Sequence, residues 1–480
     1  MSGRRMVAAF VLLVIVPAVC MAEGGGVFPL SSYLEQVREG NPALAASRAT
    51  LEGLPLKVQE ADMVYSPLFS ASYALVDDRK EPTSAMSPDR TRVKTWDVGL
   101  AKKWLTGTTT SIGYGMDSTE LFLPAGIPAM YRPFFPPSLS YDARPSVSVS
   151  QSLLRDFMSG LTDSGIGKAK SATSGQEKLE WFKANSVVFQ AEQAYWALAL
   201  ARGTVASKAE SLERTGKMRD WTKRRADLNL ADRADLLQME AAVKLRDLDL
   251  KMAREEEVSA AQKFNTTRGK DGYAVTEKLE DISARIGGTA VAVKKERDRL
   301  DVRAAGDFLE SARHAERETF YRSMPEIIAF GKATLNGYDL TAAESHDRAM
   351  EGKWPTYAAG ISLVAPLDFF TLSRVRRGYK SDYRGAKASY EKARLEEAQD
   401  WDGLTRKAGD VAARLALARE IATLQEERLA AENGRYRAGR IVTSQLLTTE
   451  EDFAQARLTM LRLGFEKLLI EAQGRFYNAE

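Results

Sequence analysis

The sequence predicts an α+β membrane protein in which alternating strands are joined to unusually long polar helices. The same order of elements (a helix, then strands, then a pair of long helices) occurs twice, from about 31 to 264 and from about 292 to 477. An internal repeat of this kind governs the whole fold. The strand segments alternate apolar and polar residues as membrane barrels do. The helical segments are much longer than the average helix of a globular domain.

The predicted organisation follows from this repeat. A signal peptide occupies 1–22, the first repeat 23–265, a connecting equatorial segment 266–291 and the second repeat 292–480. Strands are expected in the first repeat at about 67–77, 95–117 and 145–153, and in the second at about 326–340 and 354–366.

The N-terminus carries the pattern of an export signal. Arg4 and Arg5 precede an apolar run at 7–16, and Ala22 provides a small residue at the expected cleavage point. The run is shorter than the roughly 20 apolar residues that a membrane-spanning helix requires. The alternative is a lipoprotein signal with acylated Cys20. Since this is the chain's one cysteine, an intrachain disulfide is excluded.

Composition argues against several classes of function. The formal charge of +3 falls to +1 without the two signal arginines, which gives no electrostatic case for a nucleic-acid partner. With only two histidines, His314 and His346, the sequence predicts no metal site of His or Cys ligands. Gly113-Tyr114-Gly115 lacks the third glycine and following helix of a phosphate-binding loop. We therefore expect no catalytic residue, no cofactor and no enzymatic activity.

Connections between the strands differ in length in a way that is typical of outer-membrane barrels. Thr106-Gly107 forms a tight turn, whereas 77–93, 117–142 and 341–353 are long. Short periplasmic turns and long external loops are the rule in such barrels. The segment 123–137 contains five prolines, so it is unsuited to regular structure and is interpreted as an external loop.

Aromatic residues near the predicted strand ends suit a girdle at the membrane interface. They are Tyr65, Trp96, Trp104, Trp354 and Tyr357. An ordinary soluble sheet with one polar face is the alternative interpretation of these strands.

The helical segments show initiation signals and apolar stripes. Ser32 and Glu35 predict a capping box, and Pro42 predicts a second helix start. No proline occurs from 166 to 223, which allows about 85 Å of helix. An apolar stripe at helical spacing contains Val188, Ala191, Tyr195 and Leu198. Such stripes are typical of core packing in coiled coils.

Several segments, in order and spacing, resemble the TolC-like outer membrane efflux family over nearly the whole mature chain. The strand-to-helix junctions at 149–155 and 361–367 and the opening helix at 41–46 are similar to those of the family. The most recognisable segment is Arg435-Tyr436-Arg437-Ala438-Gly439-Arg440-Ile441, followed by Leu446-Leu447 and Ala456-Arg457. The corresponding segments of the first copy are 225–228, 235–237 and 240–242.

This resemblance implies a homotrimer that shares one outer-membrane β-barrel, continued by a periplasmic α-helical coiled-coil barrel. It implies the outer membrane of a Gram-negative bacterium as the location, and outer-membrane lipid as the surroundings. The implied function is the passive exit duct of a tripartite efflux or type I secretion system. The implied partners are a periplasmic adaptor (membrane fusion) protein and an inner-membrane RND or ABC transporter. The cargo and the particular pump are not readable from the sequence.

The resemblance also places the functional residues at two helix-turn-helix tips, 225–232 and 437–444, which close the tunnel and meet the adaptor. The tip residues are Arg225, Asp232, Asp235, Arg437, Gly439, Arg440, Gln445 and Thr448. We hypothesise that Arg225, Asp235, Arg437 and Arg440 hold the closed tip by polar contacts. Gly439 suits a helix C-cap with positive φ. Gln445 and Thr448 stand where some relatives have acidic rings, and Asp232 and Asp235 are possible substitutes.

The two copies differ in length. Pro67 to Gln151 spans 84 positions and Pro325 to Ala365 spans 40, so the first copy holds about 44 extra residues around Thr106-Gly107. If this hairpin enters the wall, a trimer has eighteen strands; if it lies outside the membrane, the family's twelve remain. A secreted coiled-coil structural protein or adhesin with soluble strands is the alternative function.

Overall fold

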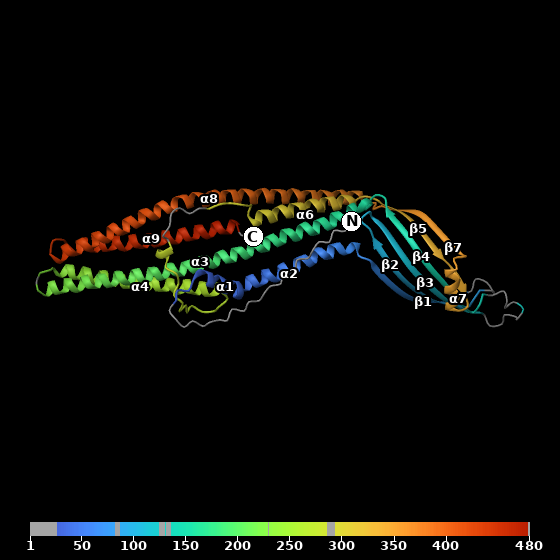
Figure 1. Cartoon of the computed structure of the whole chain (residues 1–480), viewed down its shortest axis with the longest axis horizontal. Helices are drawn as coiled ribbons and strands as arrows, with labels where there is room; N and C mark the ends of the chain where they lie inside the picture. Colours follow the sequence, from blue (N-terminus) through green and yellow to red (C-terminus); the bar gives the residue numbers. More distant parts are fainter. Residues whose placement is uncertain are drawn as a thin grey trace. The chain divides into compact units, whose positions relative to one another are not determined.

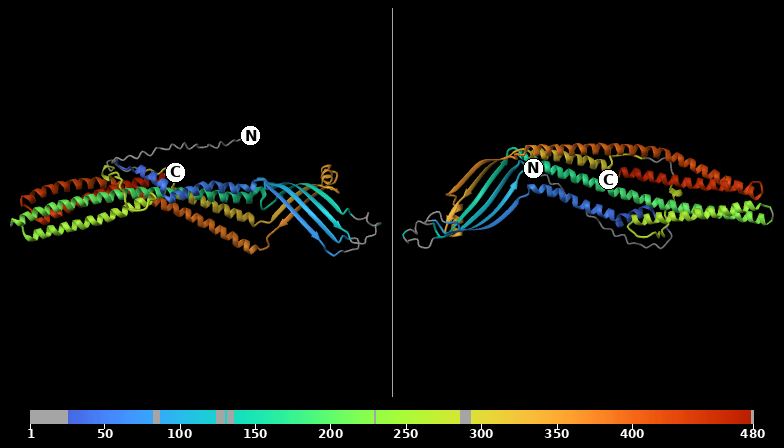
Figure 2. Two further views of the ribbon diagram at one scale, coloured as in Figure 1. Left: turned by 90° about the horizontal axis from the view of Figure 1, so that it is seen from below. Right: turned by 180° about the vertical axis from the view of Figure 1, so that it is seen from behind.

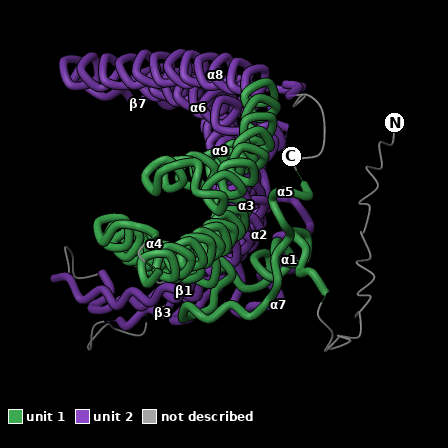
Figure 3. The backbone as a smooth tube through the Cα atoms, turned by 90° about the vertical axis from the view of Figure 1, so that its left-hand side faces the viewer, with its two compact units in different colours: residues 1–41, 190–289, 411–469 green, residues 42–189, 290–410, 470–480 purple. Residues whose placement is uncertain are grey.

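The computed structural model describes residues 26–81, 87–123, 130, 136–228, 230–285 and 293–478. The predicted signal peptide, and most of the proline-rich segment, lie outside the described residues. The chain divides into two compact units, which Figure 3 colours separately. Unit 1 contains 1–41, 190–289 and 411–469; unit 2 contains 42–189, 290–410 and 470–480. No helix among the described residues is long and apolar enough to cross a membrane.

The elements follow the order that the sequence predicts, with two helices before the first strands and a helix pair after each set of strands (Figure 1). The helices are α1 (Leu30–Gly40), α2 (Pro42–Asp62), α3 (Gly160–Asp227), α4 (Arg233–Thr267), α5 (Ile282–Arg285), α6 (Leu300–Arg322), α7 (Ala342–Met350), α8 (Phe369–Arg437) and α9 (Thr443–Asn478). The strands are β1 (Leu68–Asp78), β2 (Arg90–Lys103), β3 (Thr108–Phe122), β4 (Leu139–Ser152), β5 (Glu326–Leu335), β6 (Gly337–Asp339) and β7 (Pro355–Val364).

Unit 2 contains a single antiparallel sheet with the order β1-β2-β3-β4-β5-β7, while the short β6 pairs with β4. The strands lie side by side and run obliquely to the helices that they join (Figure 2). β1 follows α2, β4 leads to α3, β5 follows α6 and β7 leads to α8. The β2–β3 hairpin therefore differs from the other four strands, because it continues into no helix.

Three expectations about the connections need correction. β2 begins at Arg90, β3 extends to Phe122 and β4 begins at Leu139, so the strands run well beyond the predicted ends. These strand ends carry polar residues, which favour a loop in the sequence. In the structure, cross-strand pairs such as Arg92 with Glu120 satisfy these residues inside the sheet.

The segment 341–353 is also not a plain loop. It contains helix α7, which Thr341 caps by accepting a hydrogen bond from the backbone N–H of Glu344 at 3.3 Å. The Thr341 hydroxyl in turn donates to the Glu344 carboxylate at 2.9 Å, which completes a capping box that the sequence contains but the prediction missed.

The predicted capping box at Ser32 and Glu35 is wrong. Helix α1 already begins at Leu30, so Ser32 lies inside the first turn. The side chain of the N-cap residue makes no capping hydrogen bond to the helix. Instead, the backbone N–H of Leu30 donates to the distant Glu280 carboxylate at 2.9 Å. A tertiary contact therefore satisfies the exposed N–H group that a local cap would otherwise serve. The second predicted helix does begin at Pro42.

The core of unit 1 contains an aromatic cluster. Tyr33 stacks on Phe264 at 4.1 Å between ring centroids, and Tyr195 lies beside both rings. The Tyr33 hydroxyl donates to the Phe264 carbonyl at 3.0 Å, and the Tyr195 hydroxyl donates to that of Phe28 at 2.6 Å. Burial raises the pKa of Tyr195 to about 12. These rings join α1 to α3 and α4, and they confirm the predicted stripe, in which Ala191, Tyr195 and Leu198 are buried.

The long helices are continuous. α3 contains 68 residues and α8 contains 69, which corresponds to about 100 Å each at 1.5 Å per residue. The turn before α3 is conformationally costly, because Met158 and Ser159 adopt φ of 50° and 56° without being glycine. Such left-handed residues persist where surrounding contacts fix them.

Candidate functional site

Arg225 makes the hydrogen bonds that hold the turn of the first helix-turn-helix tip, between α3 and α4. Its backbone carbonyl accepts hydrogen bonds from the N–H groups of Leu228 and Leu230, and its guanidinium donates to the Leu230 carbonyl at 2.9 Å. Asp232 is the N-cap residue of α4, although its side chain makes no cap hydrogen bond. Asp235 lies in the first turn, where a carboxylate is favourable toward the helix dipole.

The second tip, between α8 and α9, ends in the backbone geometry that the sequence predicts. Gly439 has φ of 72°, and its N–H donates to the Tyr436 carbonyl at 2.9 Å. The N–H of Arg440 donates to the Arg435 carbonyl at 3.0 Å. These paired bonds after a left-handed residue terminate a helix without leaving its last carbonyls unsatisfied. The C-cap role of Gly439 is therefore structural.

The helices behind the tips share one apolar core. Its buried members are Met218, Met239, Leu429, Tyr436, Leu446 and Phe453, with Trp221, Ile441 and Leu447 packed against them. Within it, the Thr222 and Tyr436 hydroxyls are 2.6 Å apart, and Tyr436 lies 3.3 Å from the Thr443 hydroxyl. Residues from α3, α4, α8 and α9 contribute, so the core couples both helix pairs.

The structure brings some of the predicted tip residues together. A Cβ added to Gly439 would lie 3.7 Å from the Arg225 guanidinium, so the two turns are neighbours. Gln445 extends its amide to within 3.5 Å of both carboxylate oxygens of Glu432. Arg437 and Arg440 are exposed, as are Asp232 and Thr448.

Among the described residues, no ion pair joins Arg225, Asp235, Arg437 and Arg440 within one chain. The hypothesis that these four residues hold the closed tip by polar contacts stays a prediction.

Sequence reasoning missed a buried charge cluster in unit 1. The Glu450 side chain on α9 is 0% exposed. It accepts hydrogen bonds from the Ser211 hydroxyl at 2.7 Å and from Arg214 at 3.1 Å, both on α3. Arg246 on α4 lies 3.5 Å from its other oxygen. Glu450 followed by Glu451 on a polar helix looks like a solvated face, so no local signal distinguished the buried carboxylate.

The sheet of unit 2 has one apolar and one polar face. Directly paired residues in antiparallel strands share a face. One row across all six long strands contains Phe69, Leu100, Ile112, Val147, Ala333 and Tyr357. The adjacent row contains Ser70, Gly99, Gly113, Ser146, Thr334 and Thr356. In the first row the large apolar side chains are all exposed, Ile112 by 62% and Tyr357 by 78%.

The polar face is hollowed. A depression of about 520 Å³ is lined by the second row and by Asp97, Arg144 and Lys332. Arg144 also forms an ion pair of 2.6 Å with Asp117 on the same face. An apolar outer surface and a polar inner surface are what a wall between lipid and water requires.

The predicted interfacial aromatics divide between the two ends of the sheet. Tyr65 and Trp104 lie at the helix end, where Tyr65 donates to Asp163 at 2.7 Å and Trp104 donates to Thr110 at 2.9 Å. Trp96 lies on the apolar face beside Tyr73, at 4.4 Å between centroids. Trp354 and Tyr357 stand where β7 begins, and both are exposed. Their role at a membrane interface stays a prediction.

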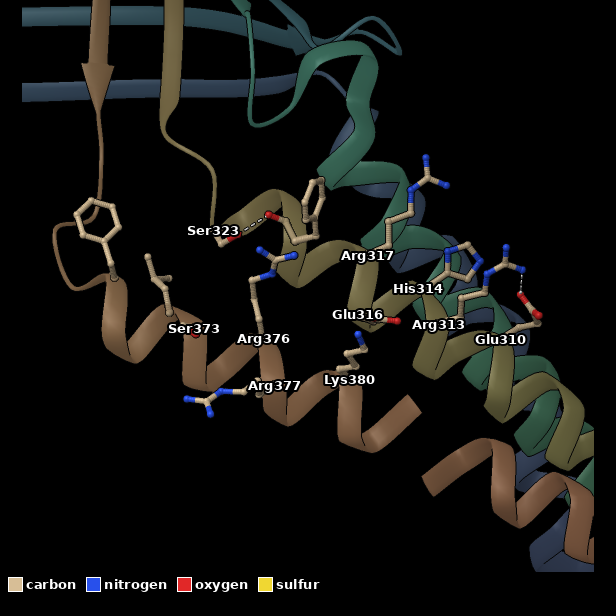
Figure 4. Close-up of a pocket in the computed structure, with 13 residues that line it drawn as sticks. Glu310, Arg313, His314, Glu316, Arg317, Ser323, Ser373, Arg376, Arg377 and Lys380 are labelled. Atoms are coloured by element: carbon tan, nitrogen blue, oxygen red, sulfur yellow. Dashed lines mark hydrogen bonds and ion pairs between the residues drawn. The ribbon is translucent and has the colours of Figure 1, made fainter. Parts of the chain in front are cut away.

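A basic groove of about 820 Å³ lies in unit 2 between α6 and the start of α8 (Figure 4). Arg313 and Arg317 project from α6, and Arg376 projects from α8. These cations have structural neighbours: Arg313 lies 3.4 Å from Glu310, and the guanidinium carbon of Arg376 lies 4.9 Å from the centroid of the Phe320 ring. His314 packs on α3, because a Cβ at Gly167 would lie 2.6 Å from its ring. The groove shows no nucleophile–base pair.

Acidic and histidine side chains are also dispersed. In the part of the chain that the structure describes, no group of three or more His, Cys, Asp or Glu residues is arranged to hold a metal ion.

A single antiparallel sheet with long strands that continue into helices of about 100 Å defines the TolC-like outer-membrane channel fold, and this chain has that fold. The resemblance that the sequence predicted is thus confirmed at the level of the fold. No family model matches the sequence, and no curated protein matches it.

Solved structures supply the match. The outer membrane protein VceC of Vibrio cholerae is 14% identical, with a TM-score of 0.66 over 94% of this chain and 96% of that one. The outer-membrane channel OprN is 17% identical, with a TM-score of 0.66 over 94% and 90%. The open state of the Neisseria gonorrhoeae MtrE outer membrane channel is 15% identical, with a TM-score of 0.61 over 94% and 88%. All three are described as outer-membrane proteins, in agreement with the predicted location.

Proposed function

We propose that the chain is the outer-membrane exit duct of a tripartite efflux or type I secretion system, and that it acts as a passive channel. It lies in the outer membrane and extends into the periplasm. The observation that carries this proposal is the two-faced sheet: an exposed apolar row at Phe69, Ile112 and Tyr357 backs a polar, hollowed row at Gly113 and Thr356. A soluble sheet would bury its apolar face instead.

The proposed assembly is a homotrimer with one shared barrel and one shared helical tunnel. A sheet of this size has two edges, and unpaired backbone groups in lipid cost several kcal/mol each. Pairing the edges of neighbouring copies removes that cost. The first turn of α8 supports the same arrangement. Phe370 is 85% exposed and Leu367, just before the helix, is 83% exposed, so these apolar side chains are available for contact with a neighbouring copy.

The proposed partners are a periplasmic adaptor and an inner-membrane RND or ABC transporter. The exposed guanidinium groups of Arg437 and Arg440 and the exposed Asp232 at the tips support an adaptor contact there.

Membrane extraction of the full chain tests the proposal. After expression in a Gram-negative host, the mature protein should sediment with outer membranes and resist salt and alkaline washing. It should enter solution only with detergent, and it should run as a trimer in mild SDS without heating. The alternative function, a secreted coiled-coil structural protein or adhesin, predicts a protein soluble without detergent. Recovery in the soluble secreted fraction would therefore refute the duct.

A further inference from the structure

The β2–β3 hairpin, which the second half of the chain lacks, is a full part of the sheet. β2 pairs with β1 over eleven residues and with β3 over fourteen, and β3 pairs with β4 over thirteen. These are the longest ladders among the described strands, where β4 and β5 share seven pairs. A hairpin outside the membrane wall would not need continuous pairing on both sides.

The hairpin also carries both faces of the wall. Val98 and Ile112 are exposed on the apolar face, by 46% and 62%. Gly99 and Gly113 pair directly on the polar face and line its depression. The apolar row and the polar row thus cross β2 and β3 without interruption.

A built contact anchors the hairpin to the start of α3. Lys103, the last residue of β2, donates to the Asp156 carboxylate at 2.5 Å and to the Thr162 hydroxyl at 2.7 Å. The Ser159 hydroxyl donates to the Trp104 carbonyl at 3.3 Å. Gly107 packs so closely that a Cβ would lie 2.2 Å from the Asp156 carbonyl oxygen. The hairpin turn is therefore fixed to the helix end of the wall.

The outer edges of the sheet are β1 and β7. Each has one pairing partner among the described residues, β2 and β5 respectively. Because six antiparallel strands alternate in direction, β1 and β7 run in opposite directions. The β7 edge of one copy is therefore set to pair in antiparallel fashion with the β1 edge of a second copy, which adds strands without breaking the alternation.

We propose that three copies close a barrel of eighteen strands, with the β2–β3 hairpin in the wall, and that this barrel is wider than the twelve-stranded one that the family resemblance implies. This inference rests on the proposed trimer. At about 4.8 Å between strands and a tilt of about 40°, eighteen strands give a perimeter of about 113 Å, against about 75 Å for twelve.

The helices that join the strands can accommodate the larger perimeter. Four helical segments of unit 2 (α2, the first part of α3, α6 and the first part of α8) join the strands. Twelve helices from three copies, spaced about 8–10 Å apart, form a ring of about 96–120 Å. An eighteen-stranded wall continues such a ring at nearly constant width.

A wider barrel changes where the duct limits the size of its cargo. At equal tilt, the cross-section grows with the square of the strand number, so the bore is about 2.3-fold larger than with twelve strands. The inner face carries small side chains along the row from Ser70 to Thr356, and these leave the bore open. Hydrophilic cargo too wide for a twelve-stranded barrel therefore passes this section, and selection by size rests with the periplasmic tips.

The decisive experiment counts strands in the assembled protein. The full mature chain is purified as a trimer in lipid nanodiscs, and a density map is determined. Eighteen strands in one closed wall are expected. Twelve strands with β2–β3 outside the wall would overturn the inference while leaving the duct intact. A soluble or monomeric protein would refute the duct proposal itself.

A second measurement tests, without a density map, whether the hairpin lies in lipid. In a background with tryptophan only at position 96, lipids brominated along the acyl chain should quench the fluorescence, because Trp96 lies on the apolar face of β2. A variant with tryptophan only at position 104, at the turn, should be quenched at least twofold less. Equal, weak quenching at both positions would contradict a hairpin in the wall.

A shortened variant supplies the matched control. Replacing 79–137 by Asn-Gly removes β2 and β3 and sets Asp77 opposite Leu139, which belong to one cross-strand row. Its trimer should show twelve strands. If the shortened and the full chain show the same number, the hairpin contributes nothing to the wall.

Discussion

Thr222 on α3 and Tyr436 on α8 join the two tips through hydroxyl groups that are 2.6 Å apart and buried. The Thr222 hydroxyl has one hydrogen, which it donates to the Met218 carbonyl at 2.9 Å. Tyr436 is therefore the donor in the shared bond, and its oxygen is left to accept from Thr443 at 3.3 Å. The result is a directed chain of hydroxyl groups that links three helices behind the turns.

Replacing Tyr436 by Phe should loosen both tips. The ring keeps its place in the apolar core, but Thr222 and Thr443 each lose a hydrogen-bond partner, at a cost of about 1 kcal/mol. Trypsin cleavage at the tip arginines under native conditions should become about fivefold faster, because local opening limits it. Tyr273→Phe, at an exposed tyrosine, is the control. An unchanged cleavage rate would mean that the hydroxyl chain does not restrain the tips.

Replacing Glu450 by Gln should destabilise unit 1 much more strongly. Its carboxylate is the buried counter-charge of Arg214 and Arg246, and removing one partner of a buried pair costs about 3–5 kcal/mol. The same change at the adjacent Glu451, which is 67% exposed, should have little effect. Thermal unfolding followed by circular dichroism separates the two variants. Equal midpoints would show that solvent already screens the Glu450 cluster.

Charge reversal at Arg440 tests the predicted gate. If Arg440 holds the closed tip through contacts with other copies, Arg440→Glu replaces attraction by repulsion and should raise the single-channel conductance in a planar bilayer. Arg219→Glu is a suitable control, because this exposed α3 arginine pairs with its neighbour Asp220. Conductance equal to that of the unaltered protein would count against Arg440 as a gate residue.

The hairpin anchor should weaken in acid. Burial alone would raise the pKa of Asp156, but hydrogen bonds from Lys103 and Thr162 outweigh it and hold that pKa below the usual 3.8. A depressed folded-state pKa adds stability above the unfolded value, and this stability is lost as pH falls through the lower folded-state value. Lys103→Met should therefore lower the unfolding temperature at pH 7, and the difference should shrink below pH 3.8.

Lys170→Met is the matched control for this titration. Lys170 forms an exposed ion pair of 2.9 Å with Asp62, and exposed pairs contribute little to stability. Its unfolding temperature should stay within a degree or so of the unaltered protein at every pH. A Lys103→Met effect that did not change with pH would assign the loss to packing rather than to the Asp156 charge.

Local patterns determined much of this fold. Period-two alternation located the long strands, because successive side chains of a strand point to opposite faces of the sheet and this sheet has one apolar and one polar face. Apolar stripes located the buried face of α3, and Gly439 marked the turn between α8 and α9 because few other residues adopt positive φ at low cost. These features depend on residues close together in the chain, so the sequence alone specified them.

Tertiary structure decided what depends on distant partners. The strand ends at Arg92 and Glu120 are polar, and only their pairing across the sheet keeps them in strands. Leu30 is capped by Glu280, 250 positions away, in place of the nearby Ser32. Glu450 is buried because three helices converge on it. The place of the β2–β3 hairpin in the sheet was likewise open, because no local residue pattern specifies which strands pair with each other.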